Sequence, residues 1–570
     1  MDVLSQASLL SSRRAPDLSN LVEMPTPGLA YAVRTAYADA FRLAVADGRA
    51  KPLLIPFCLL APFVVPALWL AVPHKRRTWF YHTRWPAMAV IIWSNVYHLA
   101  YTSSANTACA YAAGLASTWG TMLSMNLLIW TRPQFDAARV VRRVKKNEAD
   151  DGRMKVAGGG EMHTETRSTG HGGGPETVNG SGNELRARKR ISTNGAGKDE
   201  TRQDEFEYVW EPYPSDGDFL ERLAWATDLI LCFRFSGWNW SVPTIPRPQI
   251  PLQISHGDQV DVDAIPKVSR SGYKRPSTTG EFVRGRLAKI VCFYFVLDFL
   301  SVYMKKDPYF ILGPDHSGHV ALPPHLRNVP SWLLLAYREA FSLLGVYAAI
   351  EAVFGLSDLV QYWLASRFYP SRGALWQFAS TFGSFEQVLA RGLAGWWGGW
   401  WHQTFRMQFA APATYLVREG HLKRGTQLAA VATMLASFLQ SGLLHASGSF
   451  TSTPRTKPWR APAFFFLQMV GILLQQWTAR LVMLYMPLRL PQFVSRTVNL
   501  FFTLTWLFYT APLFMDDCSS TGLWLVEPVP ASPLLFLGFG NEGDHWWRWD
   551  RDHLPRLYLG ETWWQSGIAL

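Results

Sequence analysis

Two histidines lie in surroundings that could support chemistry. The first, His445, lies in the stretch SGLLHASG at 441–448, inside an apolar segment long enough to cross a membrane. A titratable side chain in such a segment is costly and usually faces a cavity or a polar partner. A desolvated imidazole stays neutral, so His445 could take a proton from an alcohol as a general base. The alternative is a histidine that only hydrogen-bonds between helices, with Ser441 and Gly442 allowing close helix packing.

The second histidine follows a tryptophan-rich stretch, GWWGGWWHQTFR, at 395–406. Membrane proteins carry aromatic belts at the interface, and a belt is the ordinary explanation for such a stretch. A belt does not account for the polar residues that follow at once. Arg406 could pair with a phosphate, while His402 and Gln403 could line a polar pocket.

Two further stretches mix polar and aromatic side chains. In DLILCFRFSGWNW at 228–240, Arg234 and Asn239 lie among aromatic residues. In DFLSVYMKKDPYF at 298–310, Asp298 is predicted to lie within the membrane. For Asp307 and the two lysines before it, we prefer the ordinary explanation of a charged helix end at the interface.

A membrane fold must position these residues. Of the 570 residues, 48% are hydrophobic and 17% are charged, whereas soluble domains average about 25% charged residues. Segments of about 20 apolar residues can cross the hydrocarbon core, so we predict an all-α polytopic membrane protein with about eight transmembrane helices. This composition largely excludes a soluble enzyme, a disordered protein and a fibrous protein. The predicted spans are 52–73, 86–103, 107–130, 288–304, 332–356, 427–448, 462–486 and 494–515, and a short apolar stretch at 407–417 is re-entrant or interfacial.

Composition and charge divide the chain into five parts. The loops 74–85 and 131–146 are strongly basic, so the positive-inside rule places both in the cytosol. The long polar segment that begins with the second loop cannot bury enough apolar surface to fold and is predicted to be disordered. The parts are an N-terminal region at 1–51, a three-span hairpin at 52–130, a basic, glycine-rich cytosolic loop at 131–215, a core at 216–515 and a C-terminal interfacial segment at 516–570.

The net charge and the motifs that are missing narrow the function. The charge of +12 could indicate nucleic-acid binding, but the lysines and arginines lie mostly between apolar blocks. That placement suits anionic lipid headgroups, so we expect a bilayer as partner and no nucleic acid. The five cysteines are scattered without a C-x-x-C pair, so neither a disulfide framework nor a metal site is expected. No P-loop, G-x-S-x-G or H-E-x-x-H motif occurs.

Taken together, the motifs resemble the wax synthase-like branch of the membrane-bound O-acyltransferases. GWWGGWWHQTFR is similar to that branch's FWGRxWHQxxR signature, and SGLLH is similar to its S-G-x-x-H element, which places His445 at the family's catalytic histidine. The resemblance extends from about 208 to the C-terminus. Further stretches occur in the family's order: WEPYP (210–214), RFSGWNW (234–240), MKKDPYF (304–310) and FGS (382–384).

The resemblance assigns roles to individual residues. It implies a buried reaction chamber in which His445 and His402 are the catalytic residues. Residues that would bind the acyl donor are Trp397, Trp401, Gln403 and Arg406. Residues that would support either the substrate or the structure of the site are Arg234, Trp238, Asn239, Asp298, Asp307 and Ser441.

Two positions depart from the family pattern. The arginine that usually follows FWG is Gly399 here, so a cationic contact with phosphate has to come from elsewhere, such as Arg406 or a loop lysine. Ala446 follows His445, where many relatives carry an acidic residue. A carboxylate that orients His445 therefore comes from another segment or is absent.

The resemblance implies acyl transfer from acyl-CoA to the hydroxyl of a lipophilic acceptor, with no tightly bound cofactor and no metal. Fungal members often acetylate terpenoid or polyketide secondary metabolites, so acetyl-CoA is favoured as donor over the long-chain acyl-CoA and fatty alcohol of a wax ester synthase. We expect a multi-pass protein of the endoplasmic reticulum, and a homo-oligomer stays open. A membrane transporter and an inactive scaffold are the alternatives from other functional classes.

Overall fold

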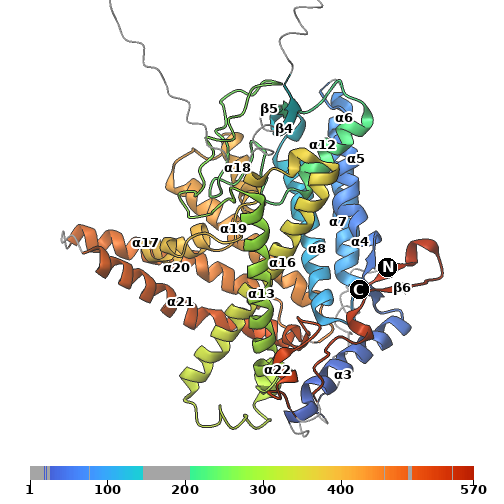
Figure 1. Cartoon of the computed structure of the whole chain (residues 1–570), viewed down its shortest axis with the longest axis vertical. Helices are drawn as coiled ribbons and strands as arrows, with labels where there is room; N and C mark the ends of the chain where they lie inside the picture. Colours follow the sequence, from blue (N-terminus) through green and yellow to red (C-terminus); the bar gives the residue numbers. More distant parts are fainter. Residues whose placement is uncertain are drawn as a thin grey trace, which may run out of the picture.

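Long helices form the body of the molecule. A computed structural model describes residues 18, 21, 26–75, 77–145, 206–454, 456–485, 491–541 and 544–570. The longer helices are α3 (Thr26–Ala46), α7 (Arg84–Tyr101), α8 (Thr107–Met125), α12 (Phe219–Leu231), α13 (Thr279–Met304), α16 (Ser331–Phe368), α17 (Glu386–Gly395), α18 (Arg406–Arg418), α19 (Gln427–Thr451), α20 (Arg460–Tyr485) and α21 (Gln492–Ser520). In Figure 1, α7, α8 and α13 run along the long axis, whereas the α20–α21 hairpin projects to one side.

Short elements connect the long helices. The short α-helices are α4 (Phe57–Leu59), α5 (Val65–Ala71), α6 (Thr78–His82), α9 (Pro133–Asp136), α14 (Pro308–Leu312), α15 (Pro314–Ser317) and α22 (Pro533–Phe536). Three π-helical turns are η1 (Leu60–Val64), η2 (Asn126–Trp130) and η5 (Trp396–Trp400), and the 3-10 turns are η3 (Pro370–Arg372), η4 (Leu375–Gln377), η6 (Leu523–Leu525), η7 (Arg551–His553) and η8 (Trp563–Gln565). Because π-helical turns often mark functional sites, η5 within the tryptophan-rich stretch is of particular interest.

Side-chain caps fix where several long helices begin. The Asn106 side chain accepts hydrogen bonds from the first backbone N–H groups of α8, and Thr426 does the same for α19. Thr278 caps α13 by accepting from the backbone of Glu281, whose carboxylate in turn accepts from the N–H of Ser277. These caps satisfy N–H groups that have no partner within the helix, so the sequence sets the three helix starts locally.

Short strands correct the prediction of an all-α chain. Strand β4 (Ala138–Val144) pairs antiparallel with β5 (Phe206–Pro212), so both ends of the segment predicted to be a disordered loop at 131–215 are ordered. They are ordered because Val140 and Trp210 bury their side chains between these strands and neighbouring loops; residues 146–205 lie outside the described residues. The other strands are β1 (Lys51–Pro52), parallel to β3 (Thr102–Ser103), and β7 (Gly567–Ala569), which lies between β2 (Leu54–Ile55) and β6 (Arg556–Tyr558).

The membrane character of the helices is confirmed, but the count of eight spans is not. Within the described ranges, four helices are long and apolar enough to cross a membrane: α13, α16, α19 and α21. The other predicted spans coincide with the segment Phe57–Ala71 and with α7, α8 and α20. The glycine and hydroxyl residues of α8 and the glutamines of α20 lower the mean hydropathy of these two helices. Such residues serve contacts between helices: Gln468 and Gln475 of α20 donate to Thr510 and Asn499 of α21.

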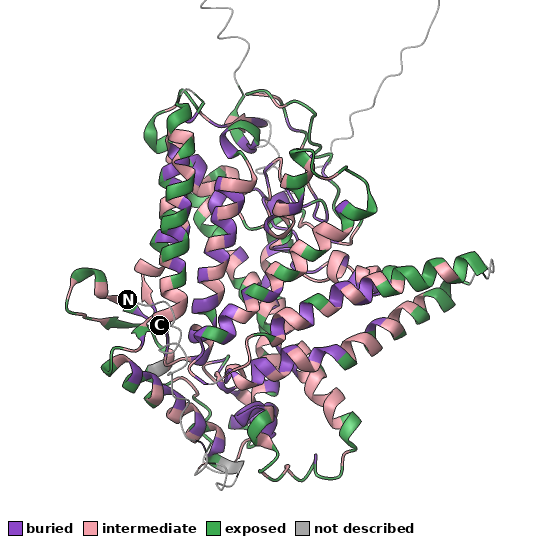
Figure 2. Ribbon diagram, turned by 180° about the vertical axis from the view of Figure 1, so that it is seen from behind, coloured by how far each residue is buried: buried purple, intermediate pink, exposed green. Residues whose placement is uncertain are grey.

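Large apolar side chains are exposed on the outer faces of the helices. Trp363, Trp477, Phe501 and Tyr509 are each more than half exposed, at 67%, 59%, 71% and 76%. Figure 2 shows exposed residues along the α20–α21 hairpin towards its free end. Apolar surface on this scale is unfavourable in water and favourable against lipid, which agrees with a membrane protein.

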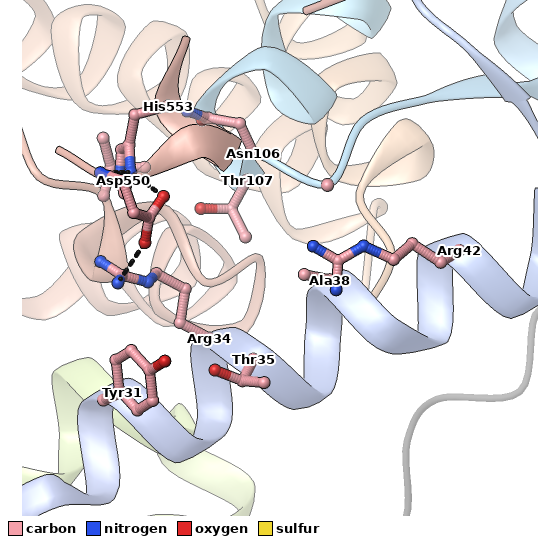
Figure 3. A pocket seen from close by; sticks show the side chains of 11 residues that line it. Tyr31, Arg34, Thr35, Ala38, Arg42, Asn106, Thr107, Asp550 and His553 are labelled. Atoms are coloured by element: carbon pink, nitrogen blue, oxygen red, sulfur yellow. Dashed lines mark hydrogen bonds and ion pairs between the residues drawn. The ribbon is translucent and has the colours of Figure 1, made fainter.

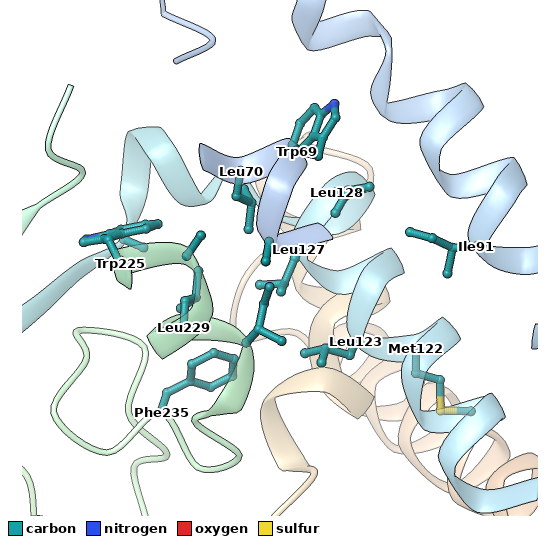
Figure 4. Close-up of a cluster of buried hydrophobic side chains, with 14 of the residues drawn as sticks. Trp69, Leu70, Ile91, Met122, Leu123, Leu127, Leu128, Trp225, Leu229 and Phe235 are labelled. Atoms are coloured by element: carbon teal, nitrogen blue, oxygen red, sulfur yellow. The ribbon is translucent and has the colours of Figure 1, made fainter. Parts of the chain in front are cut away.

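The largest buried cluster joins the first helical hairpin to the segment at 228–240. Leu70 from α5 and Leu127 from η2 pack with Trp225 and Leu229 of α12, and Phe235 lies against the same group (Figure 4). Fully burying one such side chain stabilises the fold by roughly 1.5–3 kcal/mol. The cluster therefore fixes the segment after α12 against α5 and α8.

A buried carboxylate joins the two ends of the described chain. Glu527 forms ion pairs with Arg34 of α3, at 3.2 Å, and with Lys305 and Arg548. Beside this junction lies a cavity of about 220 Å³, lined by Arg34 and Asp550 among others, which pair at 3.0 Å (Figure 3). The segment predicted to be interfacial at 516–570 is thus tied into the fold at this junction.

We expect Glu527→Gln to destabilise the protein by about 3–5 kcal/mol, because three cations lose their buried counter-ion. Burial by itself would raise the pKa of Glu527, but Lys305 and Arg548 outweigh it and lower the pKa to about 2. This stabilisation is present above the ordinary glutamate pKa and is lost as the pH falls towards 2. Thermal unfolding in detergent from pH 7 down to pH 3 measures both effects.

The matched control is Glu386→Gln, which removes one exposed ion pair with Arg496. An exposed pair contributes about 0–1 kcal/mol, so this variant should unfold close to the wild type. Equal stability of Glu527→Gln and the wild type at pH 7 would contradict the structural role of Glu527.

Candidate active site

His445 lies where α8, α19, α20 and α21 meet. Its Nδ1 is 3.2 Å from the hydroxyl of Tyr111 on α8. The ring stacks on Phe465 of α20, with centroids 5.3 Å apart and planes 10° apart, and meets Phe514 of α21 edge-on at 4.9 Å. The structure therefore gives the histidine a polar partner on one side and aromatic walls on two others.

Close packing of α19 against α20 occurs just before His445. A methyl group on Gly442 would lie 2.6 Å from Cα of Pro462, so only glycine fits there. Ser441, one residue earlier, is half-buried. The expectation that Gly442 allows a neighbouring helix to approach is confirmed, whereas support of a substrate by Ser441 stays a prediction.

A kink and two side chains fold the tryptophan-rich stretch into a closed turn. Gly392 adopts φ 57°, a conformation that glycine tolerates, and lets the N–H of Leu393 reach Oε1 of Gln475 on α20 at 3.0 Å. After η5 the chain turns back, and Nε2 of Gln403 donates to the carbonyl groups of Trp397 and Trp401 at 2.8 and 2.6 Å. These hydrogen bonds fix the backbone of Trp397 and Trp401.

Gln403 and Arg406 hold this turn from within. Arg406 Nη1 donates to Oε1 of Gln403 at 2.7 Å and to the carbonyl of Gly398 at 3.0 Å. Both amide atoms of Gln403 are therefore engaged inside the motif. The sequence pattern predicted contacts with an acyl donor for these two residues; the structure adds a function in closing the turn, and the donor contacts stay predictions.

His402 follows the turn and is surrounded by rings. Phe382 and Phe405 meet its imidazole edge-on, at 6.1 and 6.0 Å between centroids. Its Nδ1 is buried without a hydrogen-bond partner in the part of the chain that the structure describes. Burial, with the nearby His445 and Arg234, lowers the pKa of His402 to about 3, so the ring is neutral. A neutral imidazole with a free nitrogen is equipped to donate or accept one hydrogen bond.

A continuous row of aromatic contacts joins the two histidines. The ring centroids of His402 and Trp401 are 5.7 Å apart, and those of Trp401 and Trp397 are 6.1 Å apart. The ring centroids of Trp397 and Phe465 are 5.7 Å apart, and Phe465 stacks on His445. The fold thus brings together the two motifs that the sequence singled out, and four of the predicted site residues line one region.

The segment RFSGWNW has a supporting place outside this row. Arg234 donates to the carbonyl of Ser380 at 2.7 Å, and Oδ1 of Asn239 accepts from the N–H of Ala138 at 3.0 Å. Trp238 is fully buried in the cluster shown in Figure 4. These three side chains fasten the loop to β4 and to the segment before the tryptophan-rich stretch; a contact with substrate stays a prediction for each.

Asp298 and Asp307 are buried and hold backbone in place. Asp298 accepts from the N–H of Leu534 at 3.0 Å, and Asp307 forms two contacts of 2.8 Å with Arg338. Lys305 is also buried, so the interpretation of this stretch as a charged helix end at the membrane interface is wrong. It is wrong because α16 and the C-terminal segment supply partners that are distant in the sequence.

Comparisons with known proteins test the family resemblance of the segment that carries both motifs. Residues 376–467, which contain both histidines, match the model of the membrane bound O-acyl transferase family. The resemblance to the membrane-bound O-acyltransferases is confirmed. No solved structure gives a significant match to the chain.

Three curated proteins are similar in sequence to this chain. Acetyltransferase ple2 of Rhodocybe pseudopiperita is 26% identical over 232 residues, which is 40% of this chain and 50% of the relative. O-Mevalon transferase yanI of Aspergillus niger is 27% identical over 244 residues (40% and 46%), and O-mevalon transferase macI of Penicillium terrestre is 22% identical over 245 residues (41% and 47%). The matches therefore span about half the length of these relatives.

The structure places an arginine beside the glycine that departs from the O-acyltransferase signature. A methyl group on Gly399 would lie 2.6 Å from Nη2 of Arg391, so the guanidinium of Arg391 fills the space where a side chain would begin. Arg391 is exposed, and no hydrogen bond or ion pair holds it within the described ranges. Sequence reasoning did not single out Arg391, because the residue lies eight positions before Gly399 and its reach depends on the kink at Gly392.

Two other residues near the O-acyltransferase motifs were missed from the sequence. Tyr111 lies in an alanine-rich span that carries no signature, and only the packing of α8 on α19 brings it to His445. Asp228, in the family-like segment before RFSGWNW, pairs with Arg372 at 2.5 and 2.7 Å. Within the described residues, no group of three or more histidine, cysteine, aspartate or glutamate side chains could hold a metal ion.

Proposed function

We propose that this protein transfers an acyl group from acyl-CoA to the hydroxyl of a lipophilic acceptor, in a membrane of the endoplasmic reticulum. The single observation that carries the proposal is the placement of His445 in an apolar span, with aromatic walls and a row of rings leading to His402. A general base in surroundings that exclude water suits an alcohol acceptor, because water would otherwise hydrolyse the thioester.

The reaction assigns a different task to each histidine. Nε2 of His445 takes the alcohol proton while the alcohol oxygen forms a bond to the thioester carbonyl carbon. His402 supplies an N–H to the oxyanion of the tetrahedral intermediate, a role supported by its neutral ring and unpartnered nitrogen. The C–S bond then breaks, and the proton on His445 passes to the departing thiolate, which gives ester and free CoA.

Two arginines are the proposed contacts for the phosphates of the donor. Arg391 lies beside Gly399, with no partner for its guanidinium among the described residues, and Arg406 emerges from the same turn. Guanidinium groups suit phosphate oxygens because both present matching hydrogen-bond geometry. This pair would supply the positive charge that the family signature places at the position of Gly399.

The relatives' names favour a short acyl donor for this chain, and the resemblance to fungal family members favours a terpenoid or polyketide acceptor. Ester formation by purified protein in detergent tests the proposal, with radiolabelled acetyl-CoA or palmitoyl-CoA as donor and farnesol or hexadecanol as acceptor. We expect product with acetyl-CoA and farnesol. Product only with palmitoyl-CoA and hexadecanol would indicate a wax ester synthase instead.

Two further outcomes would overturn the proposal. Protein that binds no acyl-CoA by calorimetry and forms no ester would be a scaffold. Flux of farnesol or acetyl-CoA across sealed proteoliposomes, without ester formation, would indicate a transporter.

A further inference from the structure

Tyr111 gives His445 a partner that its own helix lacks. The two residues are 334 positions apart, and the tyrosine hydroxyl lies 3.2 Å from Nδ1 of the histidine. We propose that Tyr111 is the positioning residue of His445, which holds the imidazole in the tautomer and orientation needed for proton transfer. The inference rests on the proposed acyl transfer and names a residue that serves it.

Close contact between α8 and α19 fixes Tyr111 in place. A methyl group on Gly114 would lie 1.9 Å from the carbonyl oxygen of Ser447, and the hydroxyl of Ser447 donates to the carbonyl of Gly114 at 2.9 Å. A methyl group on Gly448 would lie 2.8 Å from the ring of Tyr111. Because the backbones approach this closely, neither helix can slide along the other without a clash. The hydroxyl of Tyr111 is therefore held at one height along α19.

The remaining contacts leave one ring nitrogen of His445 for a substrate. Phe465 covers one face of the imidazole and Phe514 contacts its edge. Tyr111 engages Nδ1, and Nε2 has no hydrogen-bond partner among the residues that the structure describes. Since His445 is only half-buried, Nε2 is the atom that an acceptor alcohol can reach.

The direction of the hydrogen bond follows from this assignment. A neutral imidazole carries one proton, so Nε2 can accept the alcohol proton only if Nδ1 carries the ring proton. Nδ1–H then donates to the oxygen of Tyr111. Once His445 has taken the alcohol proton, the same hydrogen bond stabilises the imidazolium until the proton passes to the leaving thiolate. Tyr111 on α8 thus orients the imidazole of His445, the task that many relatives assign to an acidic residue at the position of Ala446 on α19.

Tyr111→Phe tests the inference because it removes only the hydroxyl. With acetyl-CoA and farnesol, kcat should fall by about 10- to 100-fold, by analogy with the loss when the hydrogen-bond partner of a metal-bound histidine is removed. KM for acetyl-CoA should stay unchanged. The acid limb of the kcat profile should move to lower pH, because the imidazolium loses a hydrogen-bond acceptor that stabilised it.

The matched control is Tyr294→Phe, which removes a tyrosine hydroxyl bonded to the carbonyl of Ala531, away from His445; it should leave kcat and the acid limb unchanged. Gly448→Ala is the second variant and serves if Tyr111→Phe fails to fold. Its methyl group would displace the ring of Tyr111 while the hydroxyl is retained, so the same shift of the acid limb is expected.

Three outcomes separate failure of the inference from failure of the proposed function. No ester from the wild type would overturn both. An active wild type with unchanged kcat and acid limb in Tyr111→Phe would overturn the inference alone. A lower thermal midpoint, with kcat reduced but the acid limb unmoved in both variants, would show that Tyr111 is structural and would also overturn it.

Discussion

Replacing His445 with alanine should reduce ester formation by about 10²- to 10⁴-fold in a radiolabel assay. The variant loses the proposed general base, whose contribution is about 10²–10⁴ in rate. It also loses the ring that Phe465 and Phe514 hold at the meeting point of α19, α20 and α21. The measurement is kcat with acetyl-CoA and farnesol, together with calorimetric binding of acetyl-CoA, which should persist.

A second histidine in an apolar helix provides the control. His98 on α7 contacts the hydroxyl of Thr102 at 3.1 Å and lies outside the aromatic row. His98→Ala should keep at least half of the wild-type kcat. Full activity of His445→Ala would remove His445 from the mechanism, and an equal loss in both variants would show that the assay responds to folding instead.

Asp228→Asn should be the most destabilising substitution near the O-acyltransferase motifs, by about 3–5 kcal/mol. Asp228 forms two contacts with Arg372, at 2.5 and 2.7 Å, and one with Arg139, at 3.2 Å. All three side chains are at most 15% exposed, so the variant leaves the guanidinium of Arg372 buried beside a neutral amide and leaves Arg139 with Glu211, at 2.7 Å, as its remaining carboxylate partner. Thermal unfolding in detergent measures the loss.

The same substitution should also lower activity, because Arg372 holds the RFSGWNW loop. Its Nη1 donates to the carbonyl of Ser236 and, at 2.9 Å, to Oε1 of Gln377. Asp136→Asn is the control, since among the described residues the Asp136 carboxylate makes only an exposed pair with Arg132, at 3.5 Å; the substitution should cost about 0–1 kcal/mol. Wild-type stability in Asp228→Asn would contradict the assignment of Asp228 as the anchor of this loop.

Departures from the sequence predictions share one physical cause. Lys305 and Asp307 looked like a charged helix end, yet both are buried, because Glu527 and Arg338 neutralise them from distant segments. Likewise, the ends of the segment at 131–215 looked disordered, yet they pair as β4 and β5. Local composition reports the average cost of burying a segment. It does not report the partners that offset that cost for particular side chains.

The sequence by itself determined the membrane class, most helix positions and the two histidine motifs. Each depends on short-range features: runs of apolar residues, capping residues such as Asn106 and Thr426, and the clustering of tryptophans before His402. Hydrophobic length and local hydrogen bonding act within a few residues of the chain. Patterns of that kind can be read without knowing the fold.

Only the tertiary structure decided what completes each motif. Tyr111 reaches His445 from 334 positions away, and Arg391 fills the space beside Gly399 because Gly392 kinks α17. These contacts depend on how α8, α19 and α20 pack, and that packing depends on small residues at single positions, such as Gly114. The residues that could do chemistry can be recognised from short stretches of sequence. Their orientation depends on how all of the helices pack together.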